Sequence, residues 1–303
     1  MKYYIGIDVG GSSIKSAIVD ENGNLSSQSK VKTPETLDAF YEAIDTIACK
    51  AQKEKNIEGI AMSLPGAVDS DSGVIGGSSA VMYIHGPNIK KDVAHRTGLP
   101  VEIENDANCA ALAEVWIGNA SDVNDSMFVV CGTGIGGAVI KDKKIHRGVH
   151  LHGGEYGYEI MVFDEANHHF LTWSDVGSTI NLVSRVAKRK QVAPETLSGE
   201  EIFDHSAEDP IYQEEVDRFY DYMAIGIYNL QYTYDPEVII IGGGVSARDD
   251  LVDNINRHLD TIFQEIPIAH IRPQIRTCKY HNDANIIGAV YHFMTTKQQS
   301  SES

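Results

Sequence analysis

Residues 3–15 read YYIGIDVGGSSIK, and residues 127–141 read MFVVCGTGIGGAVIK. In each stretch an apolar strand runs into a glycine turn, and a second strand follows. Two such units, one at the start of each half of the chain, predict a duplicated α/β architecture. A third apolar segment, residues 238–241, is also typical of a buried strand and runs straight into Gly242, Gly243 and Gly244.

The length of the chain favours two domains, because 303 residues exceed the usual size of one domain, about 100–200 residues. A polar, turn-rich stretch at residues 118–126 indicates a boundary. We therefore predict a small N-terminal α/β domain at residues 1–118 and a large C-terminal α/β domain at residues 119–282. A last helix, at about residues 283–298, is expected to pack back on the first domain.

The composition excludes several classes of protein. The 25 Lys and Arg residues against 43 Asp and Glu residues give a net charge of −18, which argues against nucleic-acid binding. The sequence has no apolar run long enough for a transmembrane helix and no signal-peptide pattern, so we expect no membrane partner and a cytoplasmic location. The four cysteines show neither CxC nor CxxC spacing, which gives no support to a zinc cluster or a disulfide framework.

The three glycine turns are candidate phosphate sites. Glycine lets backbone amides approach an anion without a Cβ in the way. The spacing does not match a P-loop, because no GxxxxGK[ST] occurs. Residues 132–137 lead into a strand rather than a helix, so they do not match a dinucleotide fingerprint.

The first turn also carries polar side chains. Asp8 ends the strand, Ser12 and Ser13 offer hydroxyl groups, and Lys15 follows. A carboxylate that holds hydrated Mg²⁺ beside such donors suits the β- and γ-phosphates of a nucleotide. The alternative is an aspartate that hydrogen-bonds its own turn, which is common.

Asn105 and Asp106 lie where a buried strand meets a helix. On the residues alone, Asp106 is best interpreted as the N-cap of a helix that ends at Gly118, a role that stabilises a helix by about 1 kcal/mol. The functional alternative is a base that accepts a hydroxyl proton during phosphoryl transfer. That reaction depends more on positioning than on base strength, and a carboxylate at a helix N-terminus stays ionised.

Six motifs together carry a family resemblance: DVGGSSIK, LPGAVD, ENDANCAALAE, GTGIGG, GGEYGY and IGGGVS occur in this order along nearly the whole chain. They resemble the ROK family of sugar kinases, a branch of the actin-like ATPase superfamily. The resemblance implies two α/β domains of the actin-like (ribonuclease H-like) fold around a cleft. It also implies ATP with Mg²⁺, phosphorylation of a hexose hydroxyl at O6, and a homodimer.

The resemblance also assigns the ATP site. The first two glycine turns would hold the ATP phosphates, the third would lie against the adenosine, and Asp8 would hold Mg²⁺ through water. The residues implied are Asp8, Gly10, Gly11, Ser12, Ser13, Lys15, Gly132, Thr133, Gly134, Gly136, Gly242, Gly243 and Gly244.

On the sugar side, the resemblance makes Asp106 the catalytic base and reverses the preference for a helix cap. Asn105 and Glu155 match sugar-binding positions of the family. Asn88, in HGPNI, is a further candidate contact, and Gly66 belongs to the loop that closes over the sugar. Amide and carboxylate groups suit a polyol, since each hydroxyl both donates and accepts hydrogen bonds.

The sequence departs from the family where many members bind zinc. Tyr158 stands at the position of a histidine ligand and the cysteines are absent, so we expect no structural zinc. A second sugar-binding glutamate of the family aligns best with Ser174, beside Asp175. Its loss leaves the anomeric group unspecified and suits a β-glucoside or an altered C2 group. β-Glucoside, N-acetylmannosamine, glucose and fructose kinase activities all stay open.

Two other functions are weighed against the kinase. A sugar-sensing ROK regulator would carry a DNA-binding domain ahead of the first glycine turn, and here that turn begins within the first ten residues. An actin-like ATPase without a sugar substrate is the other alternative, and the motifs ENDAN and GGEYGY argue against it.

Overall fold

The computed structural model describes residues 1–302, with the side chains of residues 282 and 299–302 left out. The chain divides into two compact units. Unit 1 consists of Met1–Asp122, Arg147–His152 and Asn282–Ser303, and unit 2 consists of Val123–His146 and Gly153–His281. The predicted domains, residues 1–118 and 119–282, are parts expected to fold independently. The division into units does not test independent folding, so these boundaries stay predictions.

Unit 1 is built on a five-stranded sheet in the order β3-β2-β1-β4-β7. The first three strands form antiparallel hairpins, and β4 and β7 add to β1 in parallel. The strands are β1 (Tyr3–Val9), β2 (Ser13–Asp20), β3 (Leu25–Lys32), β4 (Ile57–Leu64) and β7 (Val101–Asn105).

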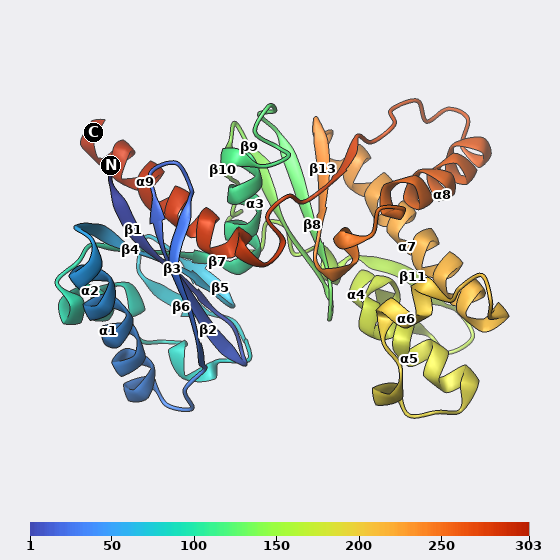
Figure 1. Cartoon of the computed structure of the whole chain (residues 1–303). Helices are drawn as coiled ribbons and strands as arrows, with labels where there is room; N and C mark the ends of the chain where they lie inside the picture. Colours follow the sequence, from blue (N-terminus) through green and yellow to red (C-terminus); the bar gives the residue numbers. More distant parts are fainter. Residues whose placement is uncertain (303) are drawn as a thin grey trace. The chain divides into compact units, whose positions relative to one another are not determined.

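Two layers of helices cover this sheet (Figure 1). Ile5 and Ile7 of β1 share a core with Phe40 and Ile44 of α1, whereas Tyr4 packs on the other side against the last helix. The helices are α1 (Leu37–Glu54) and α2 (Ile89–Thr97) on the first face, and α3 (Asp106–Ile117) and α9 (Ala284–Glu302) on the second. Burial of β1 on both faces explains its nearly continuous apolar sequence.

Unit 2 repeats the same sheet plan in the order β10-β9-β8-β13-β14. Again three strands are antiparallel and two are added in parallel. The strands are β8 (Ser126–Cys131), β9 (Ile135–Lys141), β10 (Lys144–Ile145), β13 (Val238–Gly242) and β14 (Ile275–Thr277). The duplicated architecture predicted from the two glycine-turn units is therefore confirmed.

The main core of unit 2 lies between its sheet and its helices. Trp173 and Phe219 are fully buried there against strand residues such as Val129 and Ile241. The helices are α4 (Trp173–Gly177), α5 (Thr179–Lys190), α6 (Gly199–Asp204), α7 (Pro210–Tyr234) and α8 (Leu251–Glu265).

Short elements connect these parts. Two hairpins are β5 (Ala67–Asp69) with β6 (Val74–Gly76), and β11 (Ile160–Asp164) with β12 (His169–Thr172). Single helical turns are η1 (Met82–Ile84), η2 (Tyr156–Tyr158), η3 (Pro194–Thr196), η4 (Gly244–Ala247) and η5 (His281–Asp283). The last helix continues to Glu302, beyond the end expected near residue 298.

Candidate active site

Asp8 lies near the carboxyl end of β1, where β1, β4 and β7 run in parallel. Its Oδ1 accepts hydrogen bonds from Ser63 Oγ at 3.1 Å and from Asn285 Nδ2 at 2.9 Å. Lys15 is its register partner on β2, so the two side chains project from the same face of the sheet. Open α/β sheets bind ligands outside the carboxyl ends of their strands.

The turn after β1 is held by backbone bonds. Gly10 N donates to Ser13 O at 3.0 Å, and Thr33 Oγ1 donates to Gly10 O at 2.6 Å. Gly11 and Ser12 are exposed at its tip. A Cβ on Gly11 would lie only 2.7 Å from Ala80 Cβ, so the fold itself requires glycine there.

Asn105, and not Asp106, is the N-cap of α3. Asn105 Oδ1 accepts a hydrogen bond from Asn108 N at 3.1 Å, and Asp106 is the first helical residue. The expectation that Asp106 caps this helix is therefore wrong. Asparagine is as good an N-cap as aspartate, so the helix does not need the Asp106 carboxylate for this purpose.

The Asn105 amide ties Asp106 to the loop after β4. Asn105 Nδ2 donates to Gly66 O at 3.0 Å and to Asp106 Oδ1 at 3.0 Å. Asp106 Oδ1 also accepts from Ala107 N at 2.9 Å. Gly66 has a φ of 102°, a conformation that favours glycine. The structure thus brings Gly66, Asn105 and Asp106 into direct contact.

In unit 2, the second glycine turn follows β8 and is closed by a bond from Gly132 N to Gly134 O at 3.0 Å. The first residue of α5, Thr179, donates from its backbone N and from Oγ1 to Gly132 O, at 3.1 and 2.7 Å. Thr133 is exposed at the tip of the turn. Gly136 lies on β9, just past the turn.

The third turn follows β13, whose strand pairs in parallel with β8. Gly243 has a φ of 87°, and a Cβ there would lie 2.0 Å from Cys131 O. In contrast, a Cβ on Gly132, Gly136 or Gly244 would meet no atom within 4 Å. The folded chain therefore gives no steric reason for glycine at these three positions, which leaves their backbone open to a ligand.

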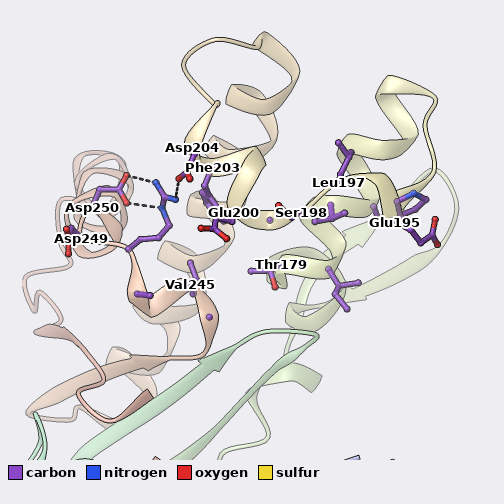
Figure 2. A pocket seen from close by; sticks show the side chains of 18 residues that line it. Thr179, Glu195, Leu197, Ser198, Glu200, Phe203, Asp204, Val245, Asp249 and Asp250 are labelled. Carbon is purple, nitrogen blue, oxygen red and sulfur yellow. Dashed lines mark hydrogen bonds and ion pairs between the residues drawn. The ribbon is translucent and has the colours of Figure 1, made fainter. Parts of the chain in front are cut away.

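The third turn opens into a cavity of about 1120 Å³ that lies wholly in unit 2. Figure 2 shows its walls, which come from α5, η3, α6 and the segment from η4 to the start of α8. Its lining residues include Thr179, Val183, Leu197, Phe203, Gly244 and Arg248. This volume is slightly above the usual range for small-molecule sites, about 300–1000 Å³.

Arg248 braces one wall of the cavity. It pairs with Asp204 at 2.7 Å and with Asp250 at 3.0 Å, and its guanidinium lies 4.9 Å from the centre of the Phe203 ring (Figure 2). These ion pairs raise the pKa of Arg248 although burial opposes them. Sequence reasoning missed these wall residues, since they follow no motif and converge only through the fold.

The two remaining predicted sugar contacts lie in different units. Asn88 caps α2 by accepting from Lys91 N at 2.9 Å, and its Nδ2 donates to Ser72 O at 2.7 Å. Local structure thus accounts for Asn88 without a ligand. Glu155 is exposed just before η2 in unit 2. Sugar binding by either residue stays a prediction.

Ser174 and Asp175 are both engaged in local structure. Ser174 Oγ accepts from Ile135 N at 3.0 Å and so holds the end of the second glycine turn. Asp175 forms the capping box of α4 with Thr172. Tyr158 is 73% exposed. Among the described residues, no group of three or more His, Cys, Asp and Glu side chains could hold a metal ion.

Comparison with known proteins identifies the family. The model of the ROK family matches residues 4–296. The chain belongs to the ROK family. A β-glucoside kinase of Listeria innocua serovar 6a is 32% identical over 293 residues, which cover 95% of this chain and 96% of the relative.

Solved structures of ROK proteins share the fold. A ROK family protein from Streptococcus pneumoniae TIGR4, in complex with sucrose, is 34% identical with a TM-score of 0.90, covering 98% of this chain and 99% of that one. A ROK family glucokinase from Streptomyces griseus, in complex with glucose and AMPPNP, is 26% identical with a TM-score of 0.77, covering 96% and 98%. The expected α/β fold of the actin-like ATPase type is confirmed.

None of the helices that the structure describes combines the length and the apolar character needed to cross a bilayer.

Proposed function

We propose that this protein is an ATP-dependent kinase that transfers the γ-phosphoryl group to O6 of a hexose or hexoside. One observation carries the proposal: Asn105 takes the cap of α3, while Asp106 directly follows β7 at the sheet edge that also holds Asp8. A base and a metal-binding carboxylate at one edge are what phosphoryl transfer to a hydroxyl requires. The kinase relatives support the same activity.

Asp106 acts in this proposal as the general base. As the sugar oxygen forms its bond to the γ-phosphorus, the bond from that phosphorus to the bridging oxygen of ADP breaks, and the hydroxyl proton passes to the Asp106 carboxylate. The Asn105 amide orients that carboxylate through its 3.0 Å bond to Oδ1. Asn105 also binds a sugar hydroxyl, and Gly66 belongs to the loop that covers the sugar.

Asp8 suits Mg²⁺ as a carboxylate that binds the ion through water. The hydrogen bonds from Ser63 and Asn285 both end on Oδ1, which fixes the carboxylate. Mg²⁺ is usually held by one or two carboxylates together with waters and substrate phosphates. When bound, the ion neutralises charge on the phosphates. The rest of the first turn contributes amides, hydroxyls and a cation beside it, from Gly10, Gly11, Ser12, Ser13 and Lys15.

The glycine turns of unit 2 bind the nucleotide. Gly132, Thr133, Gly134 and Gly136 hold phosphates, and the turn at Gly242, Gly243 and Gly244 lies against the adenosine in the cavity. The open space above Gly132, Gly136 and Gly244 supports this assignment, as does the opening of the third turn into the cavity.

A β-glucoside is the substrate class that we favour. Local structure already employs both side chains at this place, because Ser174 Oγ accepts from Ile135 N and Asp175 Oδ2 accepts from Thr172 at the start of α4. A site without an acid at the anomeric end accepts a substituent there. The β-glucoside kinase relative and the sucrose complex support this choice. Glu155 is a further sugar contact in this proposal; Asn88 is included on the family resemblance alone, since its side chain also caps α2 and bonds Ser72 O.

Two experiments test the proposal. The first measures ADP release with cellobiose, glucose, mannose, fructose and N-acetylmannosamine. The largest kcat/KM with cellobiose supports a β-glucoside kinase. If no sugar stimulates ADP release, the protein is not a sugar kinase. Asp106→Asn should retain sugar binding and lower kcat by several orders of magnitude. A kcat within about tenfold of the parent enzyme would exclude Asp106 as the base. Light scattering tests the expected homodimer.

A further inference from the structure

A buried ion pair lies next to the proposed base in the chain. Glu104 precedes Asn105 on β7, and its side chain is 0% exposed. Its Oε2 accepts hydrogen bonds from Arg147 Nε at 3.0 Å and from Arg147 Nη2 at 2.5 Å. The same Nη2 reaches Ser70 Oγ at 3.2 Å. A charge this deeply buried is costly unless it is fully paired, and Arg147 supplies the pairing.

The other oxygen of Glu104 contacts the chain on both sides of Asp106. Glu104 Oε1 accepts from the backbone N of Asn105 at 2.8 Å and from Asn108 Nδ2 at 3.0 Å. Asn108 is the residue whose backbone N donates to the capping oxygen of Asn105. One carboxylate oxygen therefore fixes both the residue before Asp106 and the first turn of the helix that follows it.

The charge of Glu104 is maintained by its surroundings. Burial alone would raise the pKa of this carboxyl, but the charge of Arg147 and the hydrogen bonds from Arg147 and Asn108 hold it below the ordinary value. Arg147 is the cation that stays charged at every working pH. Glu104 is therefore an ionised acceptor at neutral pH, and charge-assisted hydrogen bonds are stronger than neutral ones.

We propose that Glu104, held by Arg147, is a positioning residue that sets the orientation of Asp106 for proton transfer. It acts only through Asn105 and Asn108. The inference rests on the proposed role of Asp106 as the base. Displacing a catalytic group by about 1 Å can cost about a hundredfold in rate, so a rigid support at this point has a measurable effect.

If Glu104 only stabilised the fold, its loss would affect kcat no more than the loss of another buried, paired carboxylate on β7. Glu102 provides this matched control. Glu102 lies two residues earlier on the same strand and is 3% exposed. Its ion-pair partners among the described side chains are Lys90 at 2.6 Å and Lys297 at 3.4 Å. It is thus a buried, paired carboxylate on the same face of β7 whose partners belong neither to the Asn105 cap nor to the first turn of α3.

The test compares Glu104→Gln with Glu102→Gln in the full-length protein. Both variants should lower the melting temperature. Glu104→Gln should lower kcat about 10- to 100-fold and leave KM for ATP within about threefold, whereas Glu102→Gln should leave kcat within about threefold. Equal kcat values for the two variants would overturn the inference.

Further variants keep the test decisive if Glu104→Gln does not fold. Asn108→Ala removes one of the two hydrogen bonds to Glu104 Oε1 and keeps the ion pair, so kcat should still fall about fivefold or more. Arg147→Met removes the charge that pairs with Glu104, so kcat should fall, and Arg147→Lys, which keeps a charge, should recover part of that loss. Unchanged kcat in both Asn108→Ala and Arg147→Met would overturn the inference. If Asp106→Asn keeps its turnover, the proposed function fails instead, and the two failures are distinguishable.

Discussion

Asn285, on the last helix, donates a 2.9 Å hydrogen bond from Nδ2 to Oδ1 of Asp8, on the first strand, across 277 residues of sequence. Ser63 Oγ, from β4, donates to the same oxygen at 3.1 Å. Helix α9 therefore completes the site of unit 1 as well as its core. A motif search around Asp8 could not have found this contact, because the two residues lie near opposite ends of the chain.

The Asn285 contact predicts a specific defect in the use of MgATP. Asn285→Ala removes one of the two bonds that fix Asp8, so KM for MgATP should rise about 5- to 10-fold while KM for the sugar changes little. Steady-state kinetics with each substrate varied in turn measure the difference. Asn254→Ala, which removes a 3.3 Å contact to the Tyr220 hydroxyl in unit 2, is the control and should leave both constants unchanged. Equal effects of the two variants would contradict the prediction.

The cap of α3 predicts different roles for two neighbouring residues: Asn105 should contribute more to stability, and Asp106 more to catalysis. Asn105→Ala should reduce the free energy of unfolding by about 1 kcal/mol or more, because the N-cap bond and the bond to Gly66 O are both lost. Asp106→Asn should change the same quantity by less than about 1 kcal/mol, since the asparagine oxygen can still accept from Ala107 N. Urea titrations measure both. A larger stability loss in Asp106→Asn than in Asn105→Ala would show that Asp106 is the more important residue for the helix.

The glycine turns of unit 2 predict two contrasting kinds of variant. Gly243→Ala should destabilise the protein by about 2 to 4 kcal/mol, because its φ is 87° and its Cβ would meet Cys131 O at 2.0 Å. Gly244→Ala should leave the melting temperature nearly unchanged, because no atom lies within 4 Å, and should raise KM for ATP about tenfold or more. Thermal unfolding measures the stability of both variants, and steady-state kinetics measure their KM for ATP. Normal ATP binding by Gly244→Ala would remove the third turn from the nucleotide site.

His292 predicts a loss of stability at mildly acidic pH. Burial lowers the pKa of this imidazole below its ordinary value, Arg147 and Lys90 act in the same direction, and Glu104 and Glu102 oppose them. As the pH falls below about 6.5, the unfolded chain binds a proton that the folded protein resists, so the free energy of unfolding decreases.

Urea unfolding at pH 7.5 and pH 5.5 measures this effect. The parent protein should lose more stability between the two pH values than His292→Gln, which lacks the titrating group. An identical loss in both proteins would show that His292 does not contribute to this part of the pH dependence.

Much of the fold could be predicted from local patterns. The buried strand expected at residues 238–241 is β13 (Val238–Gly242), because its consecutive apolar residues suit a strand that is covered on both faces. The glycine-turn units predicted the duplicated sheets, since each strand that precedes a turn is buried and apolar. The N-cap of α3 was assigned to the wrong neighbour, because Asn and Asp cap helices equally well and only geometry separates them.

The sequence by itself determined the family, the two strand–turn–strand units and the candidates Asp8 and Asp106, because these depend on residue type and short spacing. Only the tertiary structure decided which neighbour caps α3, that Asn285 reaches Asp8, and that Glu104 joins Asn105 to Arg147. It also revealed the cavity walls around Arg248. The physical reason is that these contacts join segments far apart in the chain or depend on side-chain direction, and neither leaves a local signal in the sequence.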